Sequence, residues 1–274
     1  MKHHLLNKLV SVCSAAAVVC SMSVYIPSDT ADAADDSNIV DFSISDMTMT
    51  DDYCTNAFDK EMAYLLAFDT ERLLAGFREN AGLSTNGAKR YGGWENTNIA
   101  GHCVGHYLTA LAQAYQNPNC SSTQKDSLYK RMKTLIDGMQ ACQKHPRGKT
   151  GFLWVAPVPS DGNVERQFDR VEIGKANIFD DAWVPWYTMH KLIEGIVDVY
   201  KATNYAPAKE IGSNLGDWVY NRCSKWSEQT QRTVLSIEYG GMNDYATRIT
   251  LTRIESKDDT DADMTTDNLE YSQL

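Results

Sequence analysis

The feature that most constrains this chain is a helical spacing of apolar residues through its centre. Apolar side chains recur every three or four positions over residues 61–80, 101–115, 122–142, 184–203 and 206–226. This spacing places one apolar stripe on each helix. The chain shows no alternation of strand and helix patterns, which disfavours a doubly wound sheet. The sequence therefore predicts an all-α body of mostly antiparallel helices.

Short polar or glycine-containing segments divide these helices. Asp69 or Thr70 is expected to break the first apolar stretch and cap the next helix, which Gly82 then ends. Residues 144–182 contain several prolines and glycines and no helical stripe, so they predict one long loop region. Loops of this length in a compact domain tend to carry function.

The two ends of the chain differ from its centre. Residues 1–34 combine two early lysines, an apolar run at 9–24 and small residues around Ala33, which is the pattern of a secretory signal peptide. The run is shorter than the roughly 20 residues that span a bilayer. We therefore expect a secreted protein with no membrane segment after cleavage. Residues 245–274 hold three basic and seven acidic residues without helical period, which predicts a polar, disordered tail.

Charge and cysteine content exclude several classes of protein. The formal net charge is −10 and no basic block exists, which disfavours nucleic-acid binding. Beyond the signal segment the cysteines are sparse and odd in number, and no C-x-x-C pair occurs, which argues against both a disulfide framework and a zinc ribbon. These cysteines are Cys54, Cys103, Cys120, Cys142 and Cys223.

Two histidines form the first candidate site. His102 and His106 are four residues apart, so both lie on one helix face, opposite the apolar stripe of the same helix. Such a pair could bind a metal or a ligand, although the glutamate of an H-E-x-x-H motif is missing. Gly101 and Gly105 indicate close approach by another helix or a ligand. A tightly packed helix with hydrogen-bonded histidines remains the alternative.

Two further segments combine aromatic rings or glycines with carboxylates. Trp183, Trp186 and His190 lie on one helix flank, where indole rings could stack on a sugar; core tryptophans are the alternative. Glu238 and Asp244 flank a Gly-Gly bend, and a carboxyl pair is the minimum for glycoside hydrolysis. Trp94-Glu95, which follows Gly92-Gly93, is a weaker candidate of the same type.

Six segments, taken in order, resemble a known family. They are LLAFDTERLLAGFRENAGL (65–83), YGGWE (91–95), AGHCVGHYLTALAQAY (100–115), the segment from Asp137-Gly138 to Cys142-Gln143, VPWYTMHKLIEGIVDVY (184–200) and EYGGMND (238–244). Together they resemble the N-terminal portion of the β-L-arabinofuranosidase-like glycoside hydrolases of family 127 and its relative, family 146.

The resemblance implies an (α/α)6 toroid with its site in a central funnel. Residues 35–244 would then form the N-terminal half of the catalytic domain. The histidine and tryptophan flanks would face the funnel, and His190 is the residue we most expect to contact sugar. The implied ligand is a plant cell-wall oligosaccharide that contains arabinose.

The family's chemistry implies a cysteine thiolate nucleophile in a zinc site of cysteines and a glutamate, with a second glutamate as acid/base. Those cysteines lie downstream, and this chain has no cysteine after Asp244. We therefore expect zinc only in the full-length family and no cofactor or metal here. Asp244 also stands where many relatives carry Glu.

Three interpretations follow. The chain is an inactive, truncated fragment of a secreted glycosidase, with a frameshift just after Asp244 as one origin. Alternatively, it is a non-catalytic carbohydrate-binding remnant, or a helical protein that binds metal through its histidine pair. A half-toroid would also expose apolar helix faces, which favours self-association.

Overall fold

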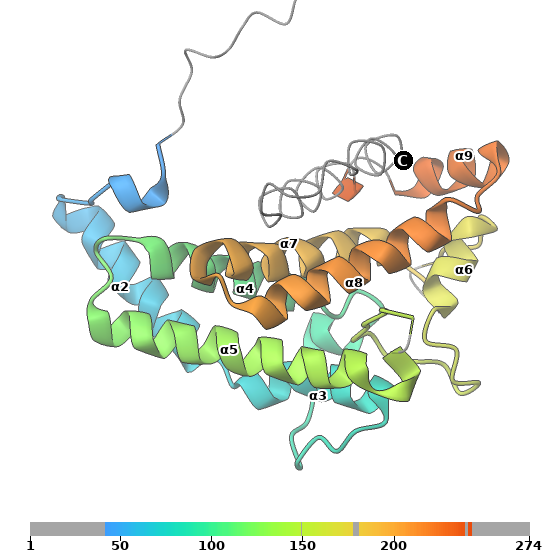
Figure 1. Cartoon of the computed structure of the whole chain (residues 1–274), viewed down its shortest axis with the longest axis horizontal. Coiled ribbons are helices and arrows are strands. Elements are labelled where there is room, and N and C mark those ends of the chain that lie inside the picture. The colour runs from blue at the N-terminus through green and yellow to red at the C-terminus, as the bar shows by residue number, and fades with distance from the viewer. Residues whose placement is uncertain (1–41, 149, 178–180, 239–240, 243–274) are drawn as a thin grey trace, which may run out of the picture. The chain divides into compact units, whose positions relative to one another are not determined.

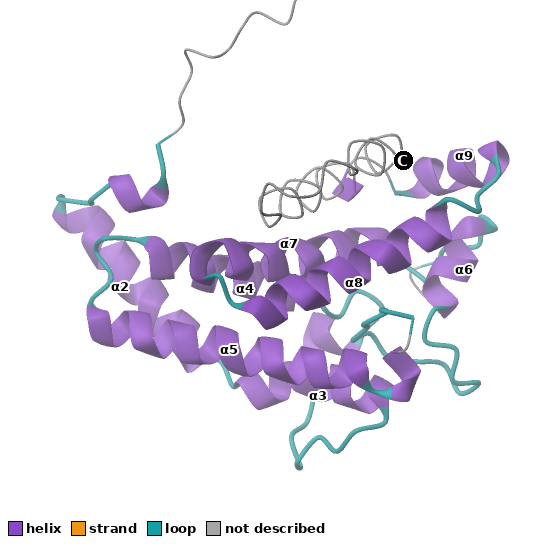
Figure 2. Ribbon diagram, viewed as in Figure 1, coloured by secondary structure: helices purple, strands orange, loops and turns teal. Residues whose placement is uncertain are grey.

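The computed structural model describes residues 42–148, 150–177, 181–238 and 241–242 (Figure 1). Within these residues it contains eight α-helices and no strand (Figure 2). The predicted all-α class is therefore confirmed, whereas the expected signal segment (1–34) and tail (245–274) lie outside the described residues. The helices are α2 (Asp52–Ala67), α3 (Thr70–Ala81), α4 (His102–Gln116), α5 (Ser122–Lys144), α6 (Arg166–Glu172), α7 (Pro185–Thr203), α8 (Ala206–Cys223) and α9 (Glu228–Ile237). Short 3-10 turns are η2 (Ile44–Asp46), η3 (Gly93–Asn96) and η4 (Pro146–Gly148).

Local capping explains where several helices begin and end. The Asp69 side chain accepts a hydrogen bond from the Glu71 amide at 2.9 Å and caps α3. Gly82 ends α3 with φ of 75°, a left-handed conformation that favours glycine. Ser121 and Gln124 form a reciprocal capping box at the start of α5. These polar residues fix the boundaries that the sequence pattern indicates.

The region predicted as one long loop is more ordered than expected. It contains helix α6, and it contains a buried extended segment at 152–156. The buried Asn80 amide of α3 donates to the carbonyl oxygens of Trp154 at 3.0 Å and Ala156 at 2.9 Å. Arg222 of α8 holds α6 through ion pairs with Glu165, Asp169 and Glu172 at 2.5–2.6 Å. These interactions come from distant parts of the chain, so local pattern could not reveal them.

Helices α4 and α7 form the closest helix pair in the described domain. A Cβ atom built on Gly105 would lie 2.1 Å from the Lys191 carbonyl oxygen, and one on Gly195 would lie 2.3 Å from the Gly105 carbonyl oxygen. Farther along, the Thr109 hydroxyl donates to the Asp198 carboxylate at 2.7 Å. Gly105 of α4 meets Lys191 of α7, and the later residue Thr109 meets the later residue Asp198. Residue numbers thus rise in the same direction along both helices, so α4 and α7 run parallel.

The parallel course of α4 and α7 is an exception to the mostly antiparallel arrangement expected from the sequence. The two helices are not consecutive, because α5, α6 and the extended segment separate them in sequence. Their first turns consequently lie at the same end of the pair, where loop residues can join them.

Within the described part of the chain, no helix has the length and apolar character needed to cross a membrane.

We expect Gly105→Ala to destabilise the domain because its new methyl group would meet backbone atoms that cannot rotate away. The loss should be about 2 kcal/mol or more in the free energy of unfolding, measured by urea denaturation. Gly212→Ala is the matched control, since the nearest atom to its Cβ is 3.7 Å away. That variant should gain roughly 0.5–1 kcal/mol from helix propensity. Equal stability of the two variants would contradict the close contact.

Candidate functional site

Aromatic rings from three segments meet where α4 and α7 begin. The Trp94 ring centroid lies 5.5 Å from that of Trp183 and 6.0 Å from that of His102. The His102 ring lies 6.1 Å from Tyr187 and 6.2 Å from His106. We call these five residues the aromatic cluster. It joins η3, the segment that leads into α7 and the first turns of both helices, and Trp94 is 58% exposed.

The aromatic cluster includes four residues singled out from sequence, which are Trp94, His102, His106 and Trp183. Tyr187 was missed. Tyr187 follows Trp183 by four positions and precedes His190 by three, so helical spacing alone could have identified it. Trp94 directly precedes the candidate Glu95, and its exposure is visible only in three dimensions.

Glu95 positions the first turn of α4. Its two carboxylate oxygens accept from the Gly101 amide at 3.1 and 3.3 Å. Gly101 has φ of +111°, and a Cβ there would lie 2.3 Å from a Val155 methyl group, so glycine is required. His102 Nδ1 lies 2.9 Å from the Ile99 carbonyl oxygen and 3.9 Å from Glu95. This network fixes the His102 ring at the mouth of the cluster.

Cys103 lies beside the same histidine. Its sulfur is 3.3 Å from His102 Nε2. Burial and the neighbouring Glu95 carboxylate raise the pKa of Cys103 to about 12. The sulfur is therefore protonated at neutral pH and is a weak nucleophile in this state.

A second polar group lies along the α4 and α7 faces. Lys191 Nζ contacts the Glu194 carboxylate at 2.9 Å, and His190 Nε2 lies 3.7 Å from the same carboxylate. Burial, together with the positive charge of Lys191, lowers the pKa of His106. His106 is therefore a neutral donor or acceptor of hydrogen bonds near pH 7.

The predicted sugar contact His190 is largely covered. Its residue exposure is only 8%, and a Cβ on Gly241 would lie 2.8 Å from His190 Nδ1. The glycine of the predicted Gly-Gly bend thus approaches the histidine ring directly. In the described residues His190 lies beneath the site surface and is suited to support other side chains.

The expected role of Trp186 in sugar stacking needs correction. The residue is only 4% exposed, and its ring packs against Phe168 at 4.8 Å and Trp226 at 5.3 Å between centroids. With these neighbours and so little exposure, the ring has no free face to offer a sugar in the described residues. Trp186 is therefore a core residue, which is the alternative that the sequence left open.

Glu238, predicted as a weak catalytic candidate, caps α7. Its carboxylate accepts from the amides of Trp186 at 3.3 Å and Tyr187 at 2.8 Å. Burial raises the pKa of Glu238 to about 7, although these two hydrogen bonds act in the opposite direction. The carboxyl thereby ties the end of α9 to the first turn of α7. Its predicted partner Asp244 lies outside the described residues.

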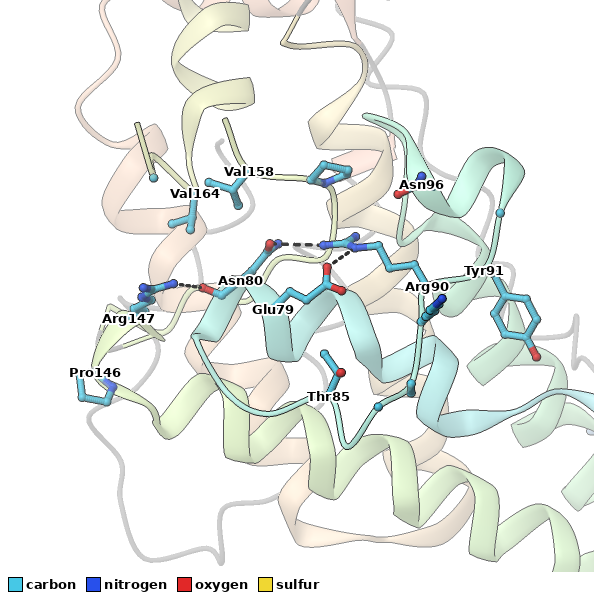
Figure 3. A pocket seen from close by; sticks show the side chains of 16 residues that line it. Glu79, Asn80, Thr85, Arg90, Tyr91, Asn96, Pro146, Arg147, Val158 and Val164 are labelled. Atoms are coloured by element: carbon cyan, nitrogen blue, oxygen red, sulfur yellow. Dashed lines mark hydrogen bonds and ion pairs between the residues drawn. The ribbon is translucent and has the colours of Figure 1, made fainter. Parts of the chain in front are cut away.

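A hollow in the domain is lined by residues other than those of the aromatic cluster (Figure 3). It has a volume of about 1140 Å³ and is lined by residues of α3, the loop after it and η4. Arg90 in this hollow pairs with Glu79, and Arg147 donates to the Asn80 carbonyl at 3.2 Å. None of the predicted site residues lines it, and two of its charged groups, Arg90 and Glu79, form an ion pair with each other. The chemistry therefore points to the aromatic cluster as the functional site.

We expect the stability of the domain to fall as pH rises from about 4.5 to about 7. In that window the folded state keeps the Glu238 proton that the unfolded chain, with the ordinary pKa of 4.5, has lost. Titration of Glu238 should lower the free energy of unfolding by roughly 2–3 kcal/mol across this window. Urea unfolding at several pH values measures the change.

Glu238→Gln should remove this part of the pH dependence while keeping the shape of the side chain. Glu228→Gln changes an exposed carboxyl in α9, the helix that ends just before Glu238, and is the matched control. It should leave the dependence of unfolding free energy on pH unchanged. An unaltered slope in Glu238→Gln would show that this carboxyl is not the titrating group.

Comparison with known proteins agrees with this architecture. The sequence model of a protein family, the β-L-arabinofuranosidase GH127 catalytic domain, matches residues 46–254 of this chain. The match extends past Asp244. A search of the curated proteins gave no match. The matched span covers well over half of the 274 residues. The chain therefore belongs to the family of glycoside hydrolases that carry the GH127 β-L-arabinofuranosidase catalytic domain.

Proposed function

We propose that the aromatic cluster binds an arabinofuranose unit of a plant cell-wall glycan in a secreted β-L-arabinofuranosidase-like protein. The observation that carries this proposal is the pair of Trp94 and Trp183, whose ring planes are inclined by only 32°. Two adjacent indole rings at this inclination provide an apolar surface for the C–H face of a sugar. Membership of the glycoside hydrolase family supports the ligand class.

Polar groups around the rings would fix the sugar hydroxyls. The exposed Tyr187 and the imidazoles of His102 and His106 surround the tryptophan pair, and Glu95 adds a carboxylate. A few directional hydrogen-bonding groups beside an apolar surface are typical of small-ligand sites. These residues would bind and orient the sugar at the first turns of α4 and α7.

Secretion is part of the same proposal. It is supported by the signal-peptide pattern at residues 1–34, and an extracellular location suits a polymeric plant glycan as ligand. The acidic net charge favours an uncharged glycan over an anionic one.

The zinc-thiolate chemistry implied by the family requires several cysteines and a glutamate. Among the described residues, the group suited to a metal contains one cysteine, Cys103, with Glu95 and His102. This set does not fit the family's zinc centre, and we derive no catalytic step through it.

Binding without turnover is a second candidate function for the described domain. Two features favour it: burial and the Glu95 carboxylate raise the pKa of the Cys103 thiol, and the Glu238 carboxylate accepts a hydrogen bond from the Tyr187 amide of α7. Hydrolysis of an aryl β-L-arabinofuranoside separates the candidates. Release of the aryl group by the purified chain would support the glycosidase, whereas sugar binding without release would support the binding function.

We expect Trp94→Ala to weaken binding of methyl β-L-arabinofuranoside by about 10- to 100-fold, because the variant removes an exposed stacking face. Isothermal titration calorimetry measures the change. Tyr53→Ala is the matched control, since Tyr53 is exposed on α2 and takes no part in the aromatic cluster. Wild-type affinity in a folded Trp94→Ala variant would exclude the cluster as the sugar site.

A further inference from the structure

We propose that Glu95, His102 and Cys103 form a binding site for a soft divalent cation of the Zn²⁺ class. One potential ligand atom from each residue lies within 4.8 Å of the others. This inference goes beyond sugar binding and departs from the sequence-based expectation that the chain holds no metal.

The spacing of the donor atoms suits a tetrahedral ion. With Zn–S and Zn–N bonds of about 2.3 and 2.0–2.1 Å, neighbouring tetrahedral ligand atoms lie roughly 3.3–3.8 Å apart. Cys103 Sγ and His102 Nε2 are already 3.3 Å apart. Glu95 lies 3.9 Å from His102 Nδ1, so its carboxylate would have to move toward Nε2 and Sγ to complete the set.

The surroundings of the histidine favour ligation through Nε2. His102 Nδ1 lies 2.9 Å from the Ile99 carbonyl oxygen, so the ring donates its Nδ1 proton there. The lone pair is then on Nε2, the atom that faces Cys103. Ligating histidines characteristically use the other ring nitrogen in this way, which fixes the tautomer and the ring orientation.

The other two ligands are also held in place. Glu95 accepts from the Gly101 amide, and Cys103 occupies the first turn of α4 directly after His102. A positioned carboxylate needs no large rearrangement to reach an ion. The backbone turn that begins α4 therefore holds both Glu95 and Cys103 in position.

The mixed donor set selects the class of metal. One sulfur, one imidazole nitrogen and one carboxylate oxygen suit Zn²⁺, whereas Mg²⁺ and Ca²⁺ prefer oxygen ligands alone. Binding would break the Cys103 S–H bond, form a metal–sulfur bond and release the proton to solvent. Three protein ligands leave a fourth position for water or a sugar hydroxyl.

This site differs from the two metal sites considered from sequence. The family's zinc centre uses several cysteines, whereas this one uses a single cysteine. The histidine pair is also a different set, since the ring of His106 is perpendicular to that of His102 and lies 6.2 Å away, and the metal-capable group does not include it.

Titration of the reduced, purified chain with Co²⁺ tests the proposal directly. We expect one Co²⁺ per chain, with intense visible bands of tetrahedral geometry and a thiolate-to-cobalt charge-transfer band that Zn²⁺ abolishes on displacement. Cys103→Ser should lose the charge-transfer band. It should also weaken Zn²⁺ binding by at least the roughly 10- to 100-fold that loss of a supporting residue costs.

Two control variants make the result specific. Cys54→Ser removes the second cysteine that is exposed among the described residues, and it should keep the cobalt spectrum, as should His106→Ala. The proposal is wrong if the folded wild-type chain shows no charge-transfer band, or if Cys103→Ser retains it. Circular dichroism confirms folding, and arabinoside binding in the presence of a chelator tests the proposed function independently.

Discussion

The close approach of α4 and α7 at Gly105 and Gly195 is the contact on which the rest of the domain depends. Each glycine gives space to the backbone of the opposite helix, at distances that no side chain would allow. Because the helices run parallel, their first turns are brought to the same end. The site therefore results from a backbone contact between two helices that are remote in sequence.

The loops at that end are held by specific polar contacts. Glu95 fixes the turn into α4, and Glu238 caps α7, so each first turn is secured by a carboxylate from a different element. Helix starts carry unpaired amide groups and a partial positive charge, which carboxylates satisfy. These contacts set the positions of the aromatic rings, and the rings determine which ligand fits.

The sequence predicted the helices well because the apolar period along α4 and α7 is strong. It also indicated that Gly105 marks a close helix contact. It misplaced Trp186, since periodicity identifies a helix flank but cannot tell whether distant residues such as Phe168 and Trp226 cover it. It missed α6, because that short helix is held by Arg222 of α8 rather than by its own apolar pattern.

Native-state hydrogen exchange followed by mass spectrometry or NMR tests the central role of the α4–α7 pair most directly. Amides around Leu108 in α4 and Leu192 in α7 should exchange last, together, and only through global unfolding. Amides of α9, which buries few side chains, should exchange earlier. Fast or separate local opening of α4 and α7 would contradict the account.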